Sequence, residues 1–584
     1  FTLDSRFGLD RGFDLYEDSF ADASSPTPFL VPERRGTETV ALARRWLQAH
    51  ADSPRFCWVH LYEPHFPYDP PEPFKSQFHR DPYHGAVAAA DAALEPLLAP
   101  IFAEGGAGRT LVVLTADHGE ALGEHGESTH GIFAYEATLR VPLILYEPRL
   151  LEPRVVTESV RHVDLLPTIL DALALPSPEG LPGRSLLPLA AGALAVEATT
   201  SYFEALSASL ERGWAPLYGV VRGNAKYIDL PIPELYDLRS DPQETHNLAT
   251  EQPQLRDQMR GFLAPLRAER RETTPGLEAA DTRTRLESLG YTSVAAALPK
   301  GIPTDRDDPK RLIGLDAVLQ DVVGLYLAGD LRGALEKCQE LVRLRPGMSL
   351  SLLHLAHLLR ESGDLAGAVG ALRQAVAQNP KDPTAVSLLG AYLTQAGKAG
   401  EAVELLGPYA LRPDRDVDVQ VAYGLALARV GRRDEALAAL EKARELAPSN
   451  AMVVVDLGTV NLMTGDARRA REAFEEALAM NPGVARAQSS LAMIAADDGR
   501  VEEAFDRWRK AVAIDPREWK TLIPFSMGLW QRGRRKEARA YLDFFVASAP
   551  GTLYARDIES VRSWLGEGRS SHPAPSISPG RESP

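Results

Sequence analysis

The sequence predicts a protein of two parts, an α/β domain built on a mainly parallel sheet and an all-α superhelix. Across positions 1–271, short apolar runs alternate with longer amphipathic stretches, which is the pattern of βαβ units with the sheet between helices. Across positions 313–566, a period of about 34 residues recurs and predicts stacked helix pairs. We therefore expect domains at 1–271 and 313–566, a linker at 272–312 and a disordered tail at 567–584.

Composition excludes several classes of protein. The chain has 584 residues, of which 45% are hydrophobic and 25% charged, as in globular proteins. A net charge of −16 disfavours nucleic-acid binding. The only cysteines, Cys57 and Cys338, exclude a disulfide scaffold and a Cys-based zinc site. There is no continuous apolar run of about 18 residues, so we expect no membrane span in this chain.

The elements of the first part follow from hydrophobic spacing. Apolar side chains at helical intervals predict helices, and short apolar runs bounded by Gly or polar residues predict strands. In chain order we expect a helix at 37–50, a strand at 56–61, a helix at 83–102, strands at 111–114 and 139–146, a strand or turn at 234–241 and a closing helix at 252–271.

The stretch from Arg109 to Pro142 carries the most chemistry. A branched apolar run is followed directly by Asp117 and His118, so both lie at the carboxyl end of a predicted strand. Open α/β sheets bind their ligands at that end. A carboxylate next to an imidazole can hold a divalent cation, although the same dipeptide also forms exposed structural turns.

Several motifs resemble one family. DHGEALGEHG (117–126) with the later YE and RVPLIL resembles the second metal-binding segment of sulfatase-type hydrolases in the alkaline phosphatase superfamily. FGLDRGFDLY, WVHLYEPHFPYDPP, VDLLPTILD and ELYDLRSDPQETHNL agree with it in the order of the family. The resemblance covers roughly positions 1–263 and implies an alkaline phosphatase-like fold. Because the sequence begins with Phe close to such a motif, we expect the chain to lack an amino-terminal part and any signal peptide.

The resemblance implies a metal site and a missing nucleophile. Asp117 and His118 would be metal ligands, most simply of Ca²⁺, and the imidazole makes Mn²⁺ or Zn²⁺ credible too. In the family the nucleophile lies in a Cys/Ser-x-Pro-x-Arg motif, which this sequence does not contain. Cys57 is followed by Trp58 and not by that motif, so we interpret it as a small buried hydrophobic residue on a strand.

Three histidines complete the candidate site. The resemblance implies that His65 contacts the ester oxygens and can protonate the leaving group. His130 lies where many sulfatases place a Lys that touches sulfate. Because this sequence departs from that pattern, the choice between a sulfate ester and a phosphate ester as substrate stays open. His60 precedes His65 in the same motif and is either a substrate contact or a capped residue at a strand end. We expect His125 to lie outside the contacts with substrate.

The repeat register rests on three residue types. The Gly, Ala and Pro series below keep one constant step, apart from Pro413, which comes one position early. A Gly between two amphipathic helices, a small residue at their crossing and Pro after the second helix are typical of tetratricopeptide repeats. The series are Gly329, Gly363, Gly397, Gly431, Gly465, Gly499 and Gly533; Ala334, Ala368, Ala402, Ala436, Ala470, Ala504 and Ala538; and Pro346, Pro380, Pro413, Pro448, Pro482, Pro516 and Pro550.

Two functions follow as expectations. The first is a metal-dependent hydrolase or transferase of sulfate or phosphate esters that carries about seven tetratricopeptide units, with a protein or peptide partner in the groove of the repeats. The second is a scaffold protein whose sulfatase-like domain has lost catalysis.

Overall fold

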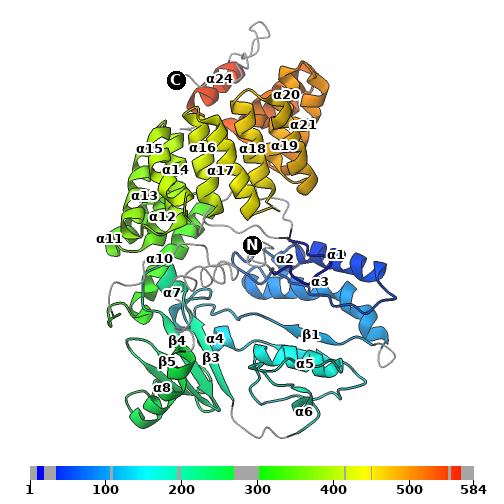
Figure 1. Ribbon diagram of the computed structural model, residues 1–584, viewed down its shortest axis with the longest axis vertical. Coiled ribbons are helices and arrows are strands. Elements are labelled where there is room, and N and C mark those ends of the chain that lie inside the picture. Colours follow the sequence, from blue (N-terminus) through cyan, green and yellow to red (C-terminus); the bar gives the residue numbers. More distant parts are fainter. Residues whose placement is uncertain are drawn as a thin grey trace.

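The computed structural model describes residues 9–18, 34–104, 109–193, 199–268, 302–412, 416–448, 450–549 and 554–566. Two parts are visible in Figure 1, an α/β part below and a curved array of helices above. The predicted tail and the predicted linker as far as residue 301 lie outside the described residues.

The first half of the α/β part is formed by helices around a small sheet. The predicted helices are confirmed within a few residues of their expected ends. The elements are α1 (Gly36–Ala49), α2 (Phe74–Gln77), α3 (Pro82–Glu104), β1 (Val112–Thr115), η3 (Glu124–Gly126), α4 (Glu136–Leu139), β2 (Leu143–Tyr146), η4 (His162–Asp164), α5 (Leu165–Ala172) and α6 (Leu187–Ala190).

The strands of this half differ from the prediction. β1 and β2 pair antiparallel, with Val112 opposite Tyr146 and Thr115 opposite Leu143, so the expected parallel pairing is wrong here. The connection between them folds back over the strand ends and needs no crossover helix. Residues 56–61 form no strand in the described part of the chain, because no neighbouring strand supplies hydrogen bonds to them.

A second sheet completes the α/β part. Its four strands pair antiparallel in the order β3-β4-β5-β6, and α8 (Pro253–Ala268) packs on one face with Met259 and Leu263 buried. Gly223 has φ +62° in the tight turn between β4 and β5, a conformation that a residue with Cβ rarely adopts. The other elements are β3 (Thr200–Ala205), α7 (Ser207–Leu210), β4 (Leu217–Arg222), β5 (Ala225–Asp229) and β6 (Glu234–Asp237).

The array confirms the predicted repeat register. Each Ala of the repeat series is fully buried, and each Gly of the series has φ between +74° and +91° after the first helix of its pair. Within the described ranges, fourteen helices make seven pairs, and α24 (Ala555–Gly566) follows them. They are α10 (Pro309–Leu327), α11 (Leu331–Leu344), α12 (Ser349–Ser362), α13 (Leu365–Gln378), α14 (Pro383–Gln395), α15 (Ala399–Ala410), α16 (Val417–Arg429), α17 (Arg433–Leu446), α18 (Ala451–Met463), α19 (Ala467–Met480), α20 (Ala485–Asp497), α21 (Val501–Ile514), α22 (Trp519–Gln531) and α23 (Arg535–Ser548).

The array is joined to the α/β part by a buried interface. Leu319 of α10, Leu341 of α11 and Met348, just before α12, pack in one cluster with Leu217 of β4 and with Trp214, which precedes β4. Arg212 forms a buried ion pair with Asp316 of α10, with a distance of 2.7 Å between Nη2 and Oδ1. Figure 1 shows α10 at this junction, beside α7.

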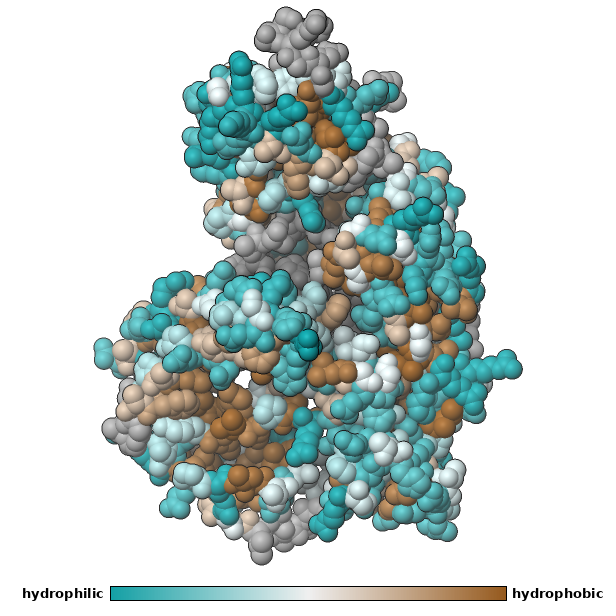
Figure 2. Space-filling model, turned by 180° about the vertical axis from the view of Figure 1, so that it is seen from behind, coloured by the Kyte–Doolittle hydropathy of each residue, from teal (hydrophilic) through white to brown (hydrophobic). Residues whose placement is uncertain are grey.

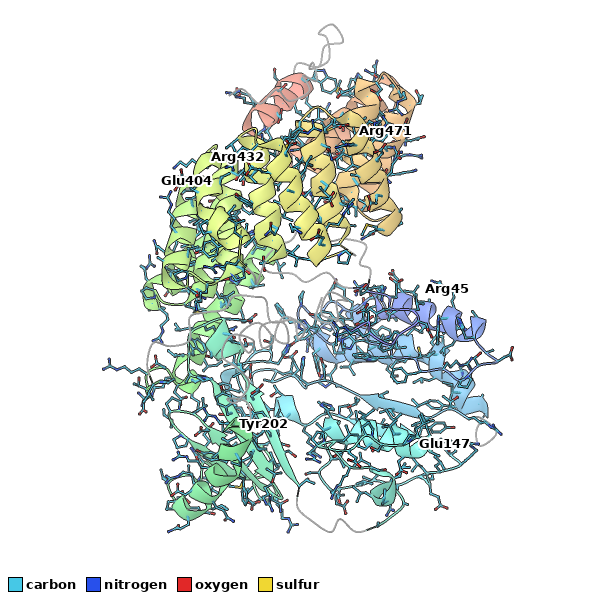
Figure 3. The ribbon with its side chains drawn as sticks, in the orientation of Figure 1. Arg45, Glu147, Tyr202, Glu404, Arg432 and Arg471 are labelled. Carbon is cyan, nitrogen blue, oxygen red and sulfur yellow. The ribbon has the colours of Figure 1, made fainter. Side chains whose placement is uncertain are left out.

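Surface character differs between the two parts. Figure 2 shows apolar side chains gathered on the rear face of the α/β part, and its exposed large side chains include Ile144, Leu166 and Leu173. The array instead carries many charged side chains, such as Arg432 and Arg471 in Figure 3. Among the described residues, only Pro82–Ala103 of α3 has the length and apolar composition of a membrane span. This finding limits our expectation that the chain has no membrane span, which was based on continuous apolar runs alone.

Candidate active site

The end of β1 is where the candidate metal ligands lie. Thr115 Oγ1 donates to the carbonyl of Pro142 at 2.9 Å, and Gly119 N donates to Thr138 O at 2.8 Å. A Cβ on Gly119 would lie 2.2 Å from the carbonyl oxygen of Ala137, so only Gly allows this close approach. These contacts fix the turn that presents Asp117 and His118.

Three imidazoles gather beside that turn. The ring centroids of His118 and His130 are 4.0 Å apart, and those of His65 and His130 are 5.1 Å apart. His60 lies close enough for the charges of Asp117 and His118 to act on its pKa. The structure therefore brings together all five residues that the sequence proposed, from three separate segments of the chain.

The same nitrogen orients each of the three rings. Nδ1 of His65 lies 2.6 Å from Phe66 O, and Nδ1 of His118 lies 2.9 Å from Gly119 O. A carbonyl only accepts, so both Nδ1 atoms must donate. Nδ1 of His130 lies 3.1 Å from a carboxylate oxygen of Glu120. Each Nε2 is thereby left available for a ligand.

Burial and neighbouring charge set the protonation of the site. Burial and the nearby imidazole of His130 lower the pKa of His65 to about 4, so His65 is neutral at pH 7. Burial also lowers the pKa of His60. Burial alone would raise the pKa of Asp117, but the imidazoles of His118 and His60 bring it below its usual value. Asp117 is thus ionised, as a metal ligand must be.

The donor atoms at this turn fit a divalent ion. Asp117 Oδ2 and His118 Nε2 are 3.7 Å apart, and two ligands at about 2.1 Å from one ion are separated by roughly this distance. His118 Nδ1 donates a hydrogen bond to a carbonyl. A hydrogen bond of this kind usually orients an imidazole that binds a metal through its other nitrogen. Within the described ranges no group of three or more His, Cys, Asp or Glu side chains could hold a metal ion, so Asp117 and His118 stand there as a pair.

Several supporting residues were not predicted. The side chain of Glu120 is 4% exposed and holds His130, and the ring of Tyr62 stacks on His65 with centroids 4.3 Å apart. His162 Nε2 donates to the carbonyl of Ala116, next to Asp117, at 2.9 Å. Glu120 closely follows Asp117, and the Asp-His-Gly-Glu sequence was the available signal. Tyr62 lies within the WVHLYEPHFPYDPP stretch, whereas His162 has no such signal.

Two other sequence interpretations can be compared with the structure. Cys57 is exposed, so its interpretation as a buried strand residue is wrong, because residues 56–61 have no strand neighbour to cover them. His125 makes its contacts with other residues. Its ring stacks on Tyr135 with centroids 3.6 Å apart, and its Nε2 lies 3.1 Å from Gln243 O.

Comparison with known families decides the identity of both parts. The sulfatase family model matches residues 4–175, and the model of the carboxyl-terminal region of N-sulphoglucosamine sulphohydrolase matches residues 123–269. Tetratricopeptide models match 325–392, 359–422, 421–467 and 455–518. The chain thus carries matches to sulfatase family models over residues 4–269, followed by a tetratricopeptide array.

The curated relatives are sulfatases. Arylsulfatase K of Xenopus laevis is 31% identical over 201 residues, which is 31% of this chain and 36% of that protein. The uncharacterized sulfatase YidJ of Escherichia coli is 31% identical over 215 residues, which is 33% of this chain and 42% of that protein. The chain thus spans about two fifths of their length or less.

Solved structures resemble the two parts separately. The putative sulfatase yidJ of Bacteroides fragilis shares 18% identity over 45% of this chain and 61% of its own, with a TM-score of 0.34. A thermophilic tetratricopeptide protein of Thermus thermophilus shares 22% identity over 31% of this chain and 99% of its own, with a TM-score of 0.29.

Proposed function

We propose that the protein is a metal-dependent hydrolase or transferase of sulfate esters, and that its tetratricopeptide array binds a protein or peptide partner. The observation that carries the proposal is the convergence of His65, His118 and His130, each held through Nδ1 with Nε2 available. Unrelated structural histidines have no reason to share this arrangement. The sulfatase relatives favour sulfate, and phosphate esters are the alternative substrates.

Asp117 and His118 would hold the ion through Oδ2 and Nε2. The bound ion would supply positive charge that neutralises the non-bridging oxygens of the ester. Family resemblance favours Ca²⁺, and the imidazole ligand suits Mn²⁺ or Zn²⁺.

His65 and His130 would contact the ester group. His65 is neutral without substrate, and an anionic sulfate beside it raises its pKa, so that Nε2 gains a proton and can donate to an ester oxygen. Glu120 orients the ring of His130 through Nδ1, at a distance of 3.1 Å. His60, whose pKa responds to the nearby charge of Asp117, would be a further contact for the substrate. The protein residues thus orient the ester and supply protons to its oxygens.

The test is turnover and metal content of the full-length protein. We expect His65→Gln to lower kcat/KM on an aryl sulfate by about 10²–10⁴, the usual contribution of a positioned acid or base. His84→Gln is the matched control, because His84 is exposed and pairs with Asp81 outside the site. A parallel assay on an aryl phosphate separates the two ester classes. Equal activity of His65→Gln and His84→Gln would refute the assigned role.

A scaffold function is the second candidate. It is favoured by the lack of a Cys/Ser-x-Pro-x-Arg motif in these 584 residues and by the lack of any group of three or more possible metal ligands among the described residues. In that case the full-length protein would bind a partner through its repeats with no turnover of either ester. Metal binding without turnover in the full-length protein would favour this candidate over the enzyme.

A further inference from the structure

The segment between His118 and His130 has an unusual backbone. Leu122 and His125, which carry side chains, have φ +51°, and three glycines at positions 123, 126 and 131 also have positive φ. A left-handed residue other than Gly is held there at a cost of about 1 kcal/mol or more by its surroundings. The contacts around the segment therefore decide where His130 lies.

Contacts within the sulfatase domain hold one side of the segment. His125 stacks on Tyr135 and bonds the carbonyl of Gln243. The buried carboxylate of Glu127 accepts hydrogen bonds from Ile132 N at 2.7 Å and Phe133 N at 3.2 Å. These bonds close the loop on itself and fix its return.

The first helix of the array holds the other side. A Cβ at Gly126 would lie 3.3 Å from Ile313 Cγ2 of α10, so the loop and this helix are in direct apposition. The hydroxyl of Tyr135 donates to both carboxylate oxygens of Glu234 at 3.1 and 3.2 Å. Lys310 Nζ lies 3.5 Å from the same carboxylate.

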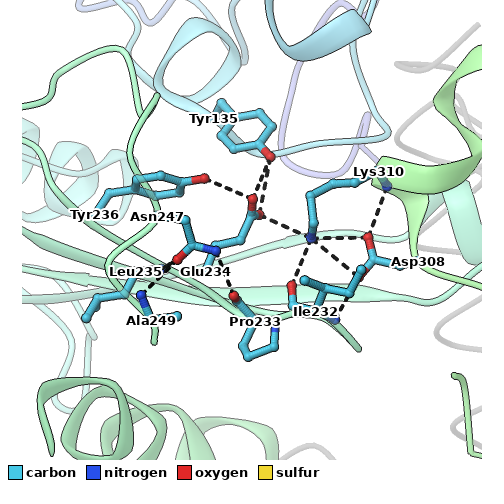
Figure 4. Close-up of polar contacts among 10 residues, drawn as sticks. All are labelled: Tyr135, Ile232, Pro233, Glu234, Leu235, Tyr236, Asn247, Ala249, Asp308 and Lys310. Atoms are coloured by element: carbon cyan, nitrogen blue, oxygen red, sulfur yellow. Dashed lines mark hydrogen bonds and ion pairs between the residues drawn. The ribbon is translucent and has the colours of Figure 1, made fainter. Parts of the chain in front are cut away.

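Lys310 is anchored in turn by its own helix and by the approach to β6. It donates to Ile232 O at 2.9 Å and lies 3.1 Å from Asp308. Asp308 is fully buried, accepts from Ile232 N at 2.8 Å and caps α10 through Lys310 N. Figure 4 shows this chain of contacts from Tyr135 through Glu234 to Lys310 and Asp308.

A cavity lies beside the same contacts. It has a volume of about 650 Å³ and is lined by Tyr135, Glu234 and Lys310, together with His125 and residues 243–245. Close packing is absent on this side of the loop. The polar contacts, and not packing, therefore resist displacement of the loop there. Loss of the contacts would leave the loop with room to move.

We propose that Lys310 of the tetratricopeptide array is a positioning residue of the sulfatase site. Through Glu234 and Tyr135, Lys310 holds the loop so that His130 stays beside His65 and His118. The first repeat is then a structural part of the site and not only a partner-binding appendage. This inference rests on the proposed function for its meaning, but its test does not need turnover.

The test is amide hydrogen exchange of the full-length protein in Lys310→Met, which keeps the apolar stem and removes the charge. We expect exchange in residues 120–135 to rise at least fivefold, because local opening of the loop becomes easier. Lys337→Met is the matched control, since this substitution on α11 removes only an exposed ion pair with Asp321. Lys310→Arg should restore protection of the loop.

Tyr135→Phe is the second variant, in case Lys310→Met does not fold. It keeps the ring that stacks on His125 and removes the hydroxyl that bonds to Glu234 and Tyr236, so it should loosen the same loop. Unchanged loop exchange in either folded variant would overturn the proposal, as would an equal rise in Lys337→Met. Failure of Lys310→Arg to restore protection would also overturn it. A protein without turnover would leave these outcomes fully readable.

Discussion

Substitution of Gly458 by Ala tests the packing of α18 against α19 at one defined contact. A Cβ at Gly458 would lie 2.6 Å from Cε1 and 2.8 Å from Cδ1 of Phe474, which is itself fully buried. Carbon atoms prefer about 3.5–4.0 Å, so about 1 Å must be taken up by movement of the two helices. Overpacking of this kind costs about 1–3 kcal/mol.

The intrinsic preference of the helix acts in the opposite direction. Ala stabilises a helix interior by about 0.5–1 kcal/mol over Gly, so we expect Gly458→Ala to be destabilising by about 1–2 kcal/mol in total. Gly370→Ala on α13 is the matched control, because a Cβ there meets nothing within 4 Å. That variant should be stabilising by about 0.5–1 kcal/mol. Urea unfolding of the full chain, followed by far-UV circular dichroism, measures both.

A second substitution makes the prediction specific. Three repeats earlier, Ala356 and Leu372 occupy the equivalent positions and are both buried, so an Ala–Leu pair packs at this helix crossing in one unit of the array. Phe474→Leu should therefore rescue Gly458→Ala, with a coupling of at least about 1 kcal/mol in a double-mutant cycle. If Gly458→Ala stabilised the chain as Gly370→Ala does, or if the coupling were zero, the helix contact would be refuted.

Three further predictions follow from other contacts. Asp117→Asn should lower affinity for a divalent ion at least tenfold, because a charged ligand is lost, and elemental analysis of the full-length protein checks this. Ala436→Phe should cost about 1–3 kcal/mol of stability at a fully buried helix crossing, and an unshifted melting curve would contradict it. Burial, with Arg212 near His354 and Arg360 near His357, lowers the pKa of both histidines to about 3. The unfolded chain therefore binds more protons than the folded chain between about pH 6.5 and 3, so this stability is present above 6.5 and lost as the pH falls through that window. Gln at both positions should flatten the pH dependence of the urea midpoint.

The repeat register could be predicted because it is local and recurs. Gly431 and Ala436 meet the same backbone and packing demands as their counterparts in every unit, so a constant step along the sequence reveals both. The candidate site was also within reach, because Asp117 and His118 follow a recognisable apolar run. The distances of Asp117 and His118 from His65 could not be predicted, because they depend on loops whose paths follow no repeating sequence pattern.

Strand direction and the joint between the two parts could not be predicted. An apolar run such as Val112–Thr115 fits either pairing, and only its partner decides between them. Residues 302–312 belong to the linker that we predicted at 272–312, a stretch rich in Thr, Asp, Arg, Gly and Pro. In the structure Asp308 is buried and Lys310 half-buried at the interface, and Glu234, which pairs with Lys310, lies far away in the sequence, on β6.

The buried interface between α10 and the second sheet holds the two parts together through non-covalent contacts, in addition to the covalent chain that links them. If the chain were cut once between residues 268 and 302, the Arg212–Asp316 pair and the apolar cluster around Trp214 would still connect the two pieces. A nicked molecule should then migrate as one species in size-exclusion chromatography and as two in denaturing gel electrophoresis. The two halves would behave as the subunits of a heterodimer, and co-expression from two genes should reassemble them.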